Sequence, residues 1–407
     1  MEFAEDDLIR PLKQRLLSFM DECVYPAEPV LAEQLDSALS PWDRPAVLAD
    51  LKAQARARGL WNLFLTHPDH GMGLTNLQYA PLAEITGWSP FLAPEALNCS
   101  APDSGNIELL AEFGTTDQKG RWLTPLLNGD RRSAFCMTEP SVASSDAANI
   151  ATRIDRAGSE LVITGRKWWS SGLMSPDCDL LLVVGVTGAG SGRHGRHSIV
   201  LAPRDTEGVT IRRSTSVFGY LDGPQGGHAE VTFDQVRVPA RCLLGEEGRG
   251  FAMAQHRLAA GRVHHCMRLI GMAERALQLA CRRAVRRVAF DVRLSDQGVV
   301  RDWIARSRIE LEKARLLVLR TAWLVDTVGA RDARMEISAI KAAVPSTALR
   351  VIDHAIQLHG AAGLSQDLPL AHMYAFARVL RIADGPDEVH HQVVAAQELR
   401  KYADDPR

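Results

Sequence analysis

The sequence lacks any long hydrophobic run, since apolar stretches such as residues 180–184 are far too short to cross a bilayer. It also lacks an excess of either charge, because 47 basic and 49 acidic residues leave a formal net charge of −2. This balance argues against binding to nucleic acid or to an anionic membrane surface. The acidic start of the chain, residues 1–7, fits neither a secretory signal nor an arginine-rich transit peptide.

Cysteine is sparse and irregularly spaced. The seven cysteines are scattered, odd in number and never in C-x-x-C spacing. This pattern favours reduced, buried thiols over disulfides or a zinc site, and we expect a cytoplasmic protein. No metal site is assigned, because the adjacent histidines at 264–265 cannot share a helix face and the pair at 390–391 offers no ligand geometry.

What the chain does have is length and apolar content. Its 407 residues, 46% of them hydrophobic, are ample for a large core and predict two or three domains. From residue 7 to about 129 the pattern is helical, with Leu8, Leu12, Leu16 and Met20 at four-residue spacing. Short β-rich runs separated by turn residues follow; they are Leu161–Ile163, Leu180–Val184, Ser198–Leu201, Val209–Ile211 and His228–Phe233.

Helical patterns return from residue 251 to 400. Helices, then strands, then helices cannot build alternating βαβ units, so we expect an α+β fold. Its predicted parts are an N-terminal all-α domain (1–131), a middle β-barrel or sandwich domain (132–243) and a C-terminal four-helix bundle (244–407). The glycine-rich stretch 185–192 lies between two β runs, which favours a flexible hairpin loop over a phosphate-binding loop.

Three short segments carry the chemistry. Residues 134–146 are dense in hydroxyl side chains and turn formers, which suit the edge of a polar heteroaromatic ring and a pyrophosphate. Trp168 and Trp169 should point to opposite faces of a strand, so that one can lie against a ligand ring while the other packs the core. Asp384 precedes Gly385, so its carboxylate can either project into a cavity or cap the next helix.

Four motifs in the same order as in one known family cover essentially the whole chain. They are T-E-P at 138–140, G-R-K-W-W at 165–169, V-P-A-R-C-L-L-G-E-E-G-R-G-F at 238–251 and Q-L-H-G-A-A-G at 357–363. With them, the sequence resembles the acyl-CoA dehydrogenases. Narrower features at 218–220, 262–265 and 383–389 resemble the branch that in animals is fused to an aminoglycoside-phosphotransferase-like kinase, a domain that we do not expect in this chain.

The resemblance implies FAD-dependent α,β-dehydrogenation of an acyl-CoA to the trans-2-enoyl-CoA within fatty acid β-oxidation, with electrons passed to an electron-transfer flavoprotein. Asp384 stands where most of the family carries its catalytic glutamate, and the alternative base position is Gly261 here. We therefore expect Asp384 to remove the α-proton, in preference to Asp387 or Glu388. Substrate-side residues implied in the same way are Ser145, Arg262, His265 and Gly385.

The implied FAD contacts come from two subunits, so a homodimer or homotetramer is expected. Within one subunit they are Phe135, Met137, Thr138, Trp169, Ser171, and either Ser144 or Ser145. Across the subunit boundary they are Arg287, Phe290, Gln357, Gly360 and Ala361, while Pro386 and Glu388 belong to the cofactor side of the Asp384 turn. Ala361 replaces the second glycine of the family pattern, so we expect a slightly less close backbone approach there. Pro386 replaces a threonine, so a hydroxyl contact to FAD is lost.

Two other functions stay open on the sequence. One is a flavin oxidase or a relative that acts on a non-CoA substrate of the nitroalkane type. The other is a non-catalytic acyl-CoA-binding protein, which the presence of Asp384, Trp169 and Thr138 together disfavours. The branch resemblance favours long-chain, branched or 4-substituted acyl groups.

Overall fold

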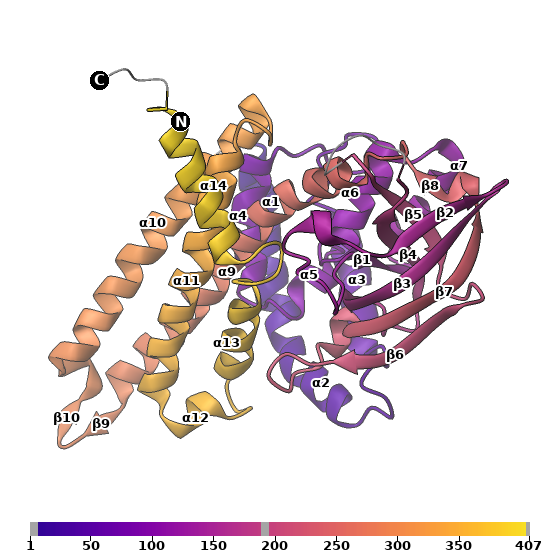
Figure 1. Ribbon diagram of the computed structural model, residues 1–407. Helices are drawn as coiled ribbons and strands as arrows, with labels where there is room; N and C mark the ends of the chain where they lie inside the picture. Colours follow the sequence, from indigo (N-terminus) through magenta and orange to yellow (C-terminus); the bar gives the residue numbers. More distant parts are fainter. Residues whose placement is uncertain (1–6, 189–194, 404–407) are drawn as a thin grey trace. The chain divides into compact units, whose positions relative to one another are not determined.

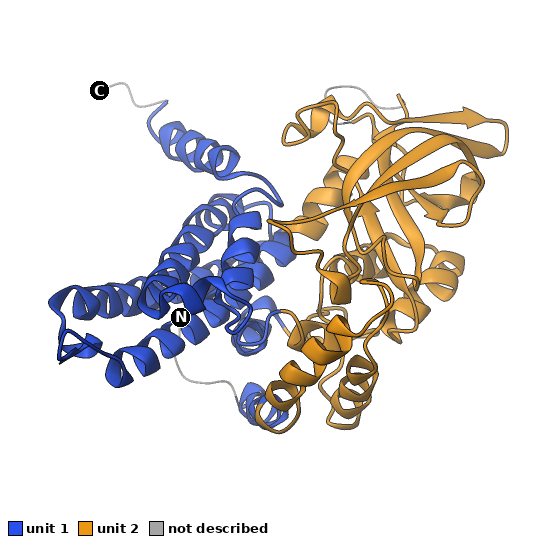
Figure 2. Ribbon diagram, turned by 90° about the horizontal axis from the view of Figure 1, so that it is seen from below, with its two compact units in different colours: residues 1–20, 75–90, 259–407 blue, residues 21–74, 91–258 orange. Residues whose placement is uncertain are grey.

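The structure is a computed structural model that describes residues 7–188 and 195–403. The chain forms two compact units, coloured in Figure 2. Unit 1 comprises residues 1–20, 75–90 and 259–407, and unit 2 comprises residues 21–74 and 91–258. These units cut across the domain boundaries expected from the sequence, which follow changes of secondary structure and remain a prediction.

Unit 2 is built on one eight-stranded sheet with the order β6-β7-β3-β2-β4-β5-β8, in which β1 pairs with β4. Most neighbouring strands are antiparallel, whereas β4 pairs in parallel with β1 and β2. The strands are β1 Arg132–Cys136, β2 Arg153–Ala157, β3 Glu160–Ser171, β4 Cys178–Val186, β5 His197–Pro203, β6 Val209–Thr215, β7 His228–Pro239 and β8 Leu243–Leu244.

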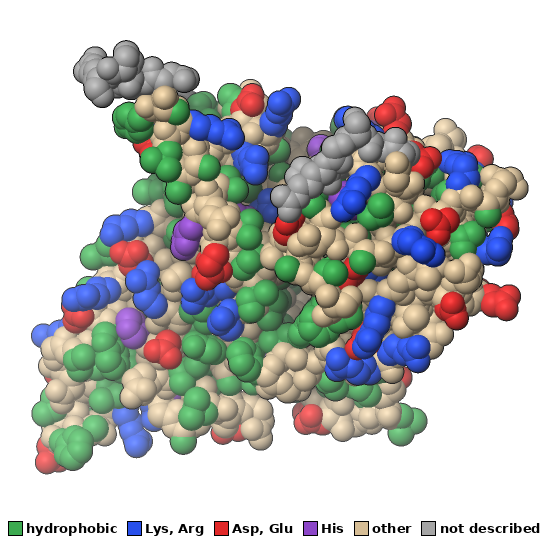
Figure 3. Space-filling model, viewed as in Figure 1, with side chains coloured by type: hydrophobic (Ala, Val, Ile, Leu, Met, Phe, Trp, Pro, Cys, Tyr) green, Lys and Arg blue, Asp and Glu red, His purple; other side chains and the backbone are tan. Residues whose placement is uncertain are grey.

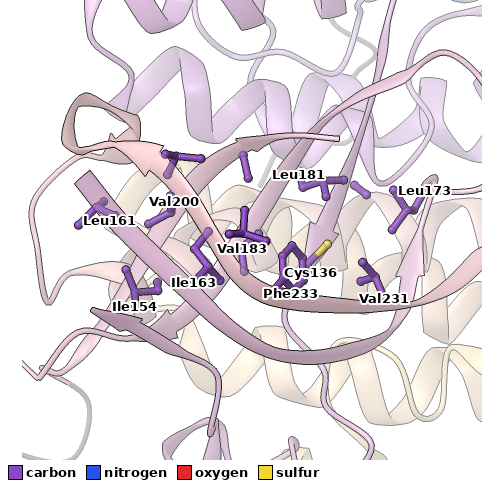
Figure 4. Close-up of a cluster of buried hydrophobic side chains, with 14 of the residues drawn as sticks. Cys136, Ile154, Leu161, Ile163, Leu173, Leu181, Val183, Val200, Val231 and Phe233 are labelled. Carbon is purple, nitrogen blue, oxygen red and sulfur yellow. The ribbon is translucent and has the colours of Figure 1, made fainter. Parts of the chain in front are cut away.

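The core of unit 2 lies among the side chains of these strands (Figure 4). It contains Cys136, Ile163, Leu181, Val183 and Phe233, each at most 1% exposed. Around the sheet lie the helices α2 Tyr25–Asp36, α3 Ala46–Ala57, α5 Ala93–Ala96, α6 Asp103–Phe113, α7 Thr116–Gln118 and α8 Thr124–Leu127 (Figure 1). Shorter π and 3₁₀ turns are Met20–Val24, Lys119–Leu123, Ala147–Asn149, Gly223–Gln225 and Ala240–Cys242.

Unit 1 is helical. Its elements are α1 Ile9–Phe19, α4 Asn76–Gly87, α9 Gly250–Arg286 (from residue 259 onward), β9 Val288–Ala289, β10 Val292–Arg293, a 3₁₀ turn Leu294–Asp296, α10 Gly298–Val328, α11 Arg334–His359, α12 Ala361–Leu364, α13 Leu370–Val379 and α14 Asp387–Arg400. Helix α11 packs against α10, α13 and α14. Glycine permits a close approach of α4 and α9, since a Cβ on Gly271 would lie 1.9 Å from the Glu84 carbonyl oxygen.

The predicted α+β class is confirmed, and each of the five predicted β runs lies within a strand, β3 to β7. Leu12, Leu16 and Met20 are buried as their spacing predicts, but Leu8 is exposed because it lies just before α1 begins. All seven cysteines are free thiols; five are buried, while Cys242 and Cys281 are half-buried. Strands β4 and β5 pair antiparallel up to Val186 and His197, and the predicted hairpin loop between them lies partly outside the described residues.

Candidate active site

The predicted site residues divide between the two units. Unit 2 holds the residues of the T-E-P and tryptophan segments: Phe135, Met137, Thr138, Ser144, Ser145, Trp169 and Ser171. Unit 1 holds the remainder: Arg262, His265, Arg287, Phe290, Gln357, Gly360, Ala361, Asp384, Gly385, Pro386 and Glu388.

Asp384 lies in the turn between α13 and α14, where two consecutive residues have left-handed backbone. Its φ is 58°, and that of Gly385 is 102°. Aspartate tolerates this region better than most residues, and glycine enters it without steric cost. A Cβ on Gly385 would meet the His390 ring at 2.9 Å, so the glycine also makes room for that ring. The turn therefore depends on both residue types.

Side chains from three helices hold the carbonyl groups of this turn. Arg262 on α9 donates from Nε and Nη2 to the Asp384 carbonyl oxygen, at 3.2 and 2.8 Å. His390 Nε2 on α14 lies 3.2 Å from the same oxygen. Lys341 on α11 is 1% exposed and donates to the Leu380 and Gly385 carbonyls. These bonds go to backbone carbonyl groups, so they fix the course of the chain at Asp384.

Burial and nearby charges shift the pKa values of the side chains that hold the Asp384 turn. Burial lowers the pKa of His390 to about 4, and the positive charges of Arg262 and Lys341 act in the same direction. Burial also lowers the pKa of Lys341, an effect that the Asp384 carboxylate opposes. The His390 imidazole is therefore neutral at pH 7, and its Nε2–H donates to the Asp384 carbonyl.

Two residues predicted on the substrate side lie beside Asp384. Arg262 makes the backbone bonds described above. The His265 Nε2 atom lies 3.9 Å from Asp384 Oδ2, too far for a direct hydrogen bond but close enough for charge interaction. The Arg262 and His265 side chains are both half-buried. Asp384 therefore has two half-buried basic residues of helix α9 as neighbours.

In unit 2, a buried ion pair fixes the T-E-P segment. Lys167 Nζ on β3 is 2.8 Å from Glu139 Oε1 and donates to the Met137 carbonyl. The Glu139 carboxylate also accepts from the backbone N–H groups of Ala151 and Thr152. Burial alone would raise the pKa of Glu139, but Lys167 and these hydrogen bonds hold it below its ordinary value. The loop that carries Met137 and Thr138 is thereby anchored to β3.

The sequence predicts that Trp168 and Trp169 alternate across a regular strand. The structure differs, because the strand is irregular at this point. A register shift between Lys167 and Ser170 places two residues of β3 opposite one of β7, which is a β-bulge. Trp169 has a φ of 51° and is 38% exposed. The bulge lifts this indole away from the core, while Trp168 remains half-buried.

Other predicted site residues of unit 2 differ in their contacts and exposure. The Ser144 hydroxyl accepts from the Glu139 backbone N–H at 2.8 Å, whereas Ser145 is exposed. The Ser144 hydroxyl thus bonds within its own loop. The Phe135 ring is covered by the guanidinium of Arg257, 4.3 Å from the ring centroid.

The residues predicted to reach the partner subunit all lie on the surface of unit 1. Arg287 is exposed, and Phe290, at the tip of the β9–β10 hairpin, is 97% exposed with a φ of 52°. Gln357, Gly360 and Ala361 are exposed around the end of α11. Figure 3 shows hydrophobic side chains at the surface where this hairpin lies, at the lower left.

The acids after Gly385 serve the start of α14. Asp387 is buried, and its Oδ2 accepts from Arg381 Nε at 2.6 Å. Glu388 is exposed in the first turn of the helix, where a negative charge is favourable. Pro386 is the N-cap residue, a position at which its fixed φ suits the helix start.

Over residues 7–188 and 195–403, no group of three or more histidines, cysteines or acids could hold a metal ion. None of the helices described is long and apolar enough to cross a membrane.

Comparison with known proteins identifies the family. The middle-domain model of the acyl-CoA dehydrogenases matches residues 134–236, and the C-terminal-domain model matches residues 248–399. The chain is 53% identical over 403 residues to a Mycobacterium tuberculosis protein named Probable acyl-CoA dehydrogenase FadE2, with 98% of each chain covered. The chain belongs to the acyl-CoA dehydrogenase family. The resemblance predicted from the motifs is thus confirmed.

Two further relatives show how much of each protein the similarity covers. It is 50% identical to Acyl-CoA dehydrogenase family member 11 of Mus musculus over 98% of its own length, but spans only about half of the mouse protein (52%). The structure of an acyl-CoA dehydrogenase homologue from Mycobacterium abscessus superposes with a TM-score of 0.95 at 51% identity, covering 98% of this chain and 100% of that one. The dehydrogenase fold expected from the sequence is therefore confirmed.

Sequence reasoning missed the residues that hold the backbone of the Asp384 turn in unit 1 and of the T-E-P segment in unit 2. Lys341 is a lysine on the buried stripe of α11 that Ile337, Val344 and Ala348 define, and a cation at such a position is a detectable signal. His390 has no such signal, because its contact with the Asp384 carbonyl depends on the shape of the turn. The Glu139–Lys167 pair lies inside two recognised motifs, but its partnership depends on a contact 28 residues apart along the chain.

Proposed function

We propose that this protein is an FAD-dependent acyl-CoA dehydrogenase in which Asp384 removes the α-proton of the thioester. The observation that carries the proposal is the Asp384 turn. Its backbone is held by Arg262, His390 and Lys341, which fixes the position of the residue that carries the carboxylate. A base that is fixed in this way meets the geometric demand of general base catalysis.

The residues of unit 2 fit a flavin. Half-buried Met137 and Thr138 offer uncharged polar atoms, and Trp169 presents a large, partly exposed aromatic face. Its left-handed backbone costs energy, and strained residues of this kind cluster at ligand sites. In our proposal, Phe135, Ser145 and Ser171 complete this side. The chemistry that FAD supplies when bound is acceptance of the hydride that leaves the β-carbon.

The protein's own part is binding, orientation and proton transfer. Asp384 accepts the α-proton as the carbon–carbon double bond forms, and the Asp384 backbone N–H is the proposed donor to the thioester carbonyl oxygen. A hydrogen bond there stabilises the enolate-like charge of the transition state. The electrons then pass to an electron-transfer flavoprotein, and acyl-CoA is the proposed source of the reducing equivalents.

The test is Asp384→Asn. This variant should retain FAD, while the rate at which an acyl-CoA bleaches the flavin absorbance under anaerobic conditions should fall by about 10²–10⁴-fold, the usual contribution of a general base. Glu398→Gln is the matched control, since Glu398 is exposed near the end of helix α14 and pairs there with Lys401, and it should bleach normally. Undiminished bleaching in Asp384→Asn would move the base to another residue. A panel of straight, branched and 4-substituted acyl-CoAs in the same assay defines the substrate.

A further inference from the structure

Three side chains of unit 2 form a hydrogen-bonded chain that ends at Ser171. The Ser171 hydroxyl oxygen is 2.8 Å from His228 Nδ1, and His228 Nε2 is 3.1 Å from Asp222 Oδ2. His228 is 16% exposed and Asp222 11% exposed, so both are largely shielded from water. The proposed function uses Ser171 but assigns no role to the other two.

The local fold brings these residues together. Ser171 on β3 and His228 on β7 are direct cross-strand partners. Asp222 has a φ of 53°, and the Gly227 backbone N–H donates back to its carbonyl at 3.0 Å. Gly226 and Gly227 also have positive φ, and this tight turn returns the chain so that Asp222 reaches the ring six residues later. The Trp169 ring lies 5.3 Å from the His228 ring.

When His228 is neutral, the chemistry of the chain fixes the direction of each hydrogen bond. An ionised carboxylate can only accept, so His228 Nε2 carries the proton that faces Asp222. In the neutral imidazole this leaves Nδ1 with a lone pair, which accepts from the Ser171 hydroxyl. The Ser171 proton is therefore directed at His228, and the serine oxygen presents its lone pairs elsewhere.

We propose that His228 and Asp222 are positioning residues that make Ser171 a hydrogen-bond acceptor toward flavin N5. This inference rests on the proposed function, in which Ser171 lies beside the flavin. In oxidised flavin N5 has a lone pair and needs a donor, whereas in reduced flavin N5 carries a hydrogen and needs an acceptor. A serine held as an acceptor thus favours reduced FAD and raises the midpoint potential.

The same residue types form the catalytic triads of hydrolases, but the arrangement here differs. In those triads the serine faces Nε2 and the carboxylate faces Nδ1. Here the ring is reversed, and Ser171 is the last residue of a strand and not part of a nucleophile turn. Orientation of the hydroxyl is the role that fits this geometry.

The test measures the midpoint potential of the FAD-bound protein, of four single variants and of one double variant. Asp222→Asn keeps the shape and suits the left-handed backbone, but it removes the charge that selects the tautomer. His228→Leu removes both hydrogen bonds. Each should shift the equilibrium toward oxidised FAD roughly tenfold, about 30 mV for a two-electron couple. His228→Asn retains an acceptor oxygen near the Nδ1 position and should restore the wild-type potential to within about twofold in the equilibrium.

Ser171→Ala closes the thermodynamic cycle. If His228 acts through Ser171, then His228→Leu should cause no further shift in the Ser171→Ala background. An unchanged potential in both Asp222→Asn and His228→Leu, or an equal shift with and without Ser171, would overturn the inference. Wild-type protein that is colourless and cannot be reconstituted with FAD would instead overturn the proposed function.

Discussion

At the scale of single residues, His390 shows how burial determines protonation. Its side chain is 3% exposed, and burial, with Arg262 and Lys341, lowers its pKa to about 4. The Nδ1 atom is buried with no partner in the described part of the chain, which also disfavours a second proton there. The imidazole is useful to the Asp384 turn only as a neutral donor.

This protonation makes stability depend on pH. The folded pKa of about 4 lies below the ordinary value of 6.5, so the unfolded chain takes up a proton first as the pH falls. The stability that His390 contributes is thus complete above about pH 6.5 and is lost toward pH 4, by roughly 3 kcal/mol at most. Urea unfolding of wild type and His390→Gln should show a difference that shrinks over this window.

Glutamine can still donate to the Asp384 carbonyl but cannot take up a proton. The comparison therefore measures the effect of His390 protonation on stability. The exposed neighbour His391, exchanged for glutamine, is the matched control. A wild-type advantage over His390→Gln that stays constant from pH 7 to pH 4 would contradict this account.

At the scale of elements, one buried ion pair anchors the loop that carries the T-E-P segment to strand β3. Lys167 is 0% exposed, and Glu139, its partner, also holds the backbone of residues 151 and 152. A pair of this kind contributes little when compared with an apolar pair, but removal of one partner leaves an uncompensated charge in the interior.

Lys167→Met should therefore lower the free energy of unfolding by about 3–5 kcal/mol, measured by urea denaturation. Arg237→Met is the matched control on the same sheet, because Arg237 pairs with Glu160 at the surface and its loss should cost at most about 1 kcal/mol. Equal losses in the two variants would show that the buried pair does not anchor the loop.

The same strand shows what sequence could and could not predict. Short β-rich runs between turn residues predicted β3 to β7, because residue type is a local signal. The family resemblance singled out Trp169 and Asp384, whose roles stay predictions. The bulge at Trp168 and Trp169 could not be predicted, since alternation assumes a regular register and the register is set by β7. Lys341 and His228 were missed for the same reason, as each acts through a contact remote in sequence, and Asp222 acts only through His228.

At the scale of the whole molecule, positive and negative side chains are interspersed over the face shown in Figure 3. This agrees with the net charge of −2. The exposed set at Arg287, Phe290 and the end of α11 is different, because it places large apolar and polar groups on open surface. We propose that a second copy of the chain brings its FAD to this surface.

Arg287→Ala should then weaken FAD retention about 10- to 100-fold, since a guanidinium that binds phosphate contributes roughly 1.5–3 kcal/mol. The measurement is FAD occupancy after dialysis, together with the mass of the oligomer in solution. Arg306→Ala is the control, because Arg306 is an exposed arginine paired within α10. Full FAD occupancy in dialysed Arg287→Ala would refute the contact between subunits.

The two left-handed residues at 384 and 385 also limit how the protein can be redesigned. An engineer who wished to extend the acid by one methylene would exchange Asp384 for glutamate, which tolerates this backbone less well than aspartate. The exchange would alter the course of the chain as well as the length of the side chain. The length of the acid and the shape of the turn therefore cannot be changed independently. A longer acid at position 384 needs a new turn sequence selected together with it.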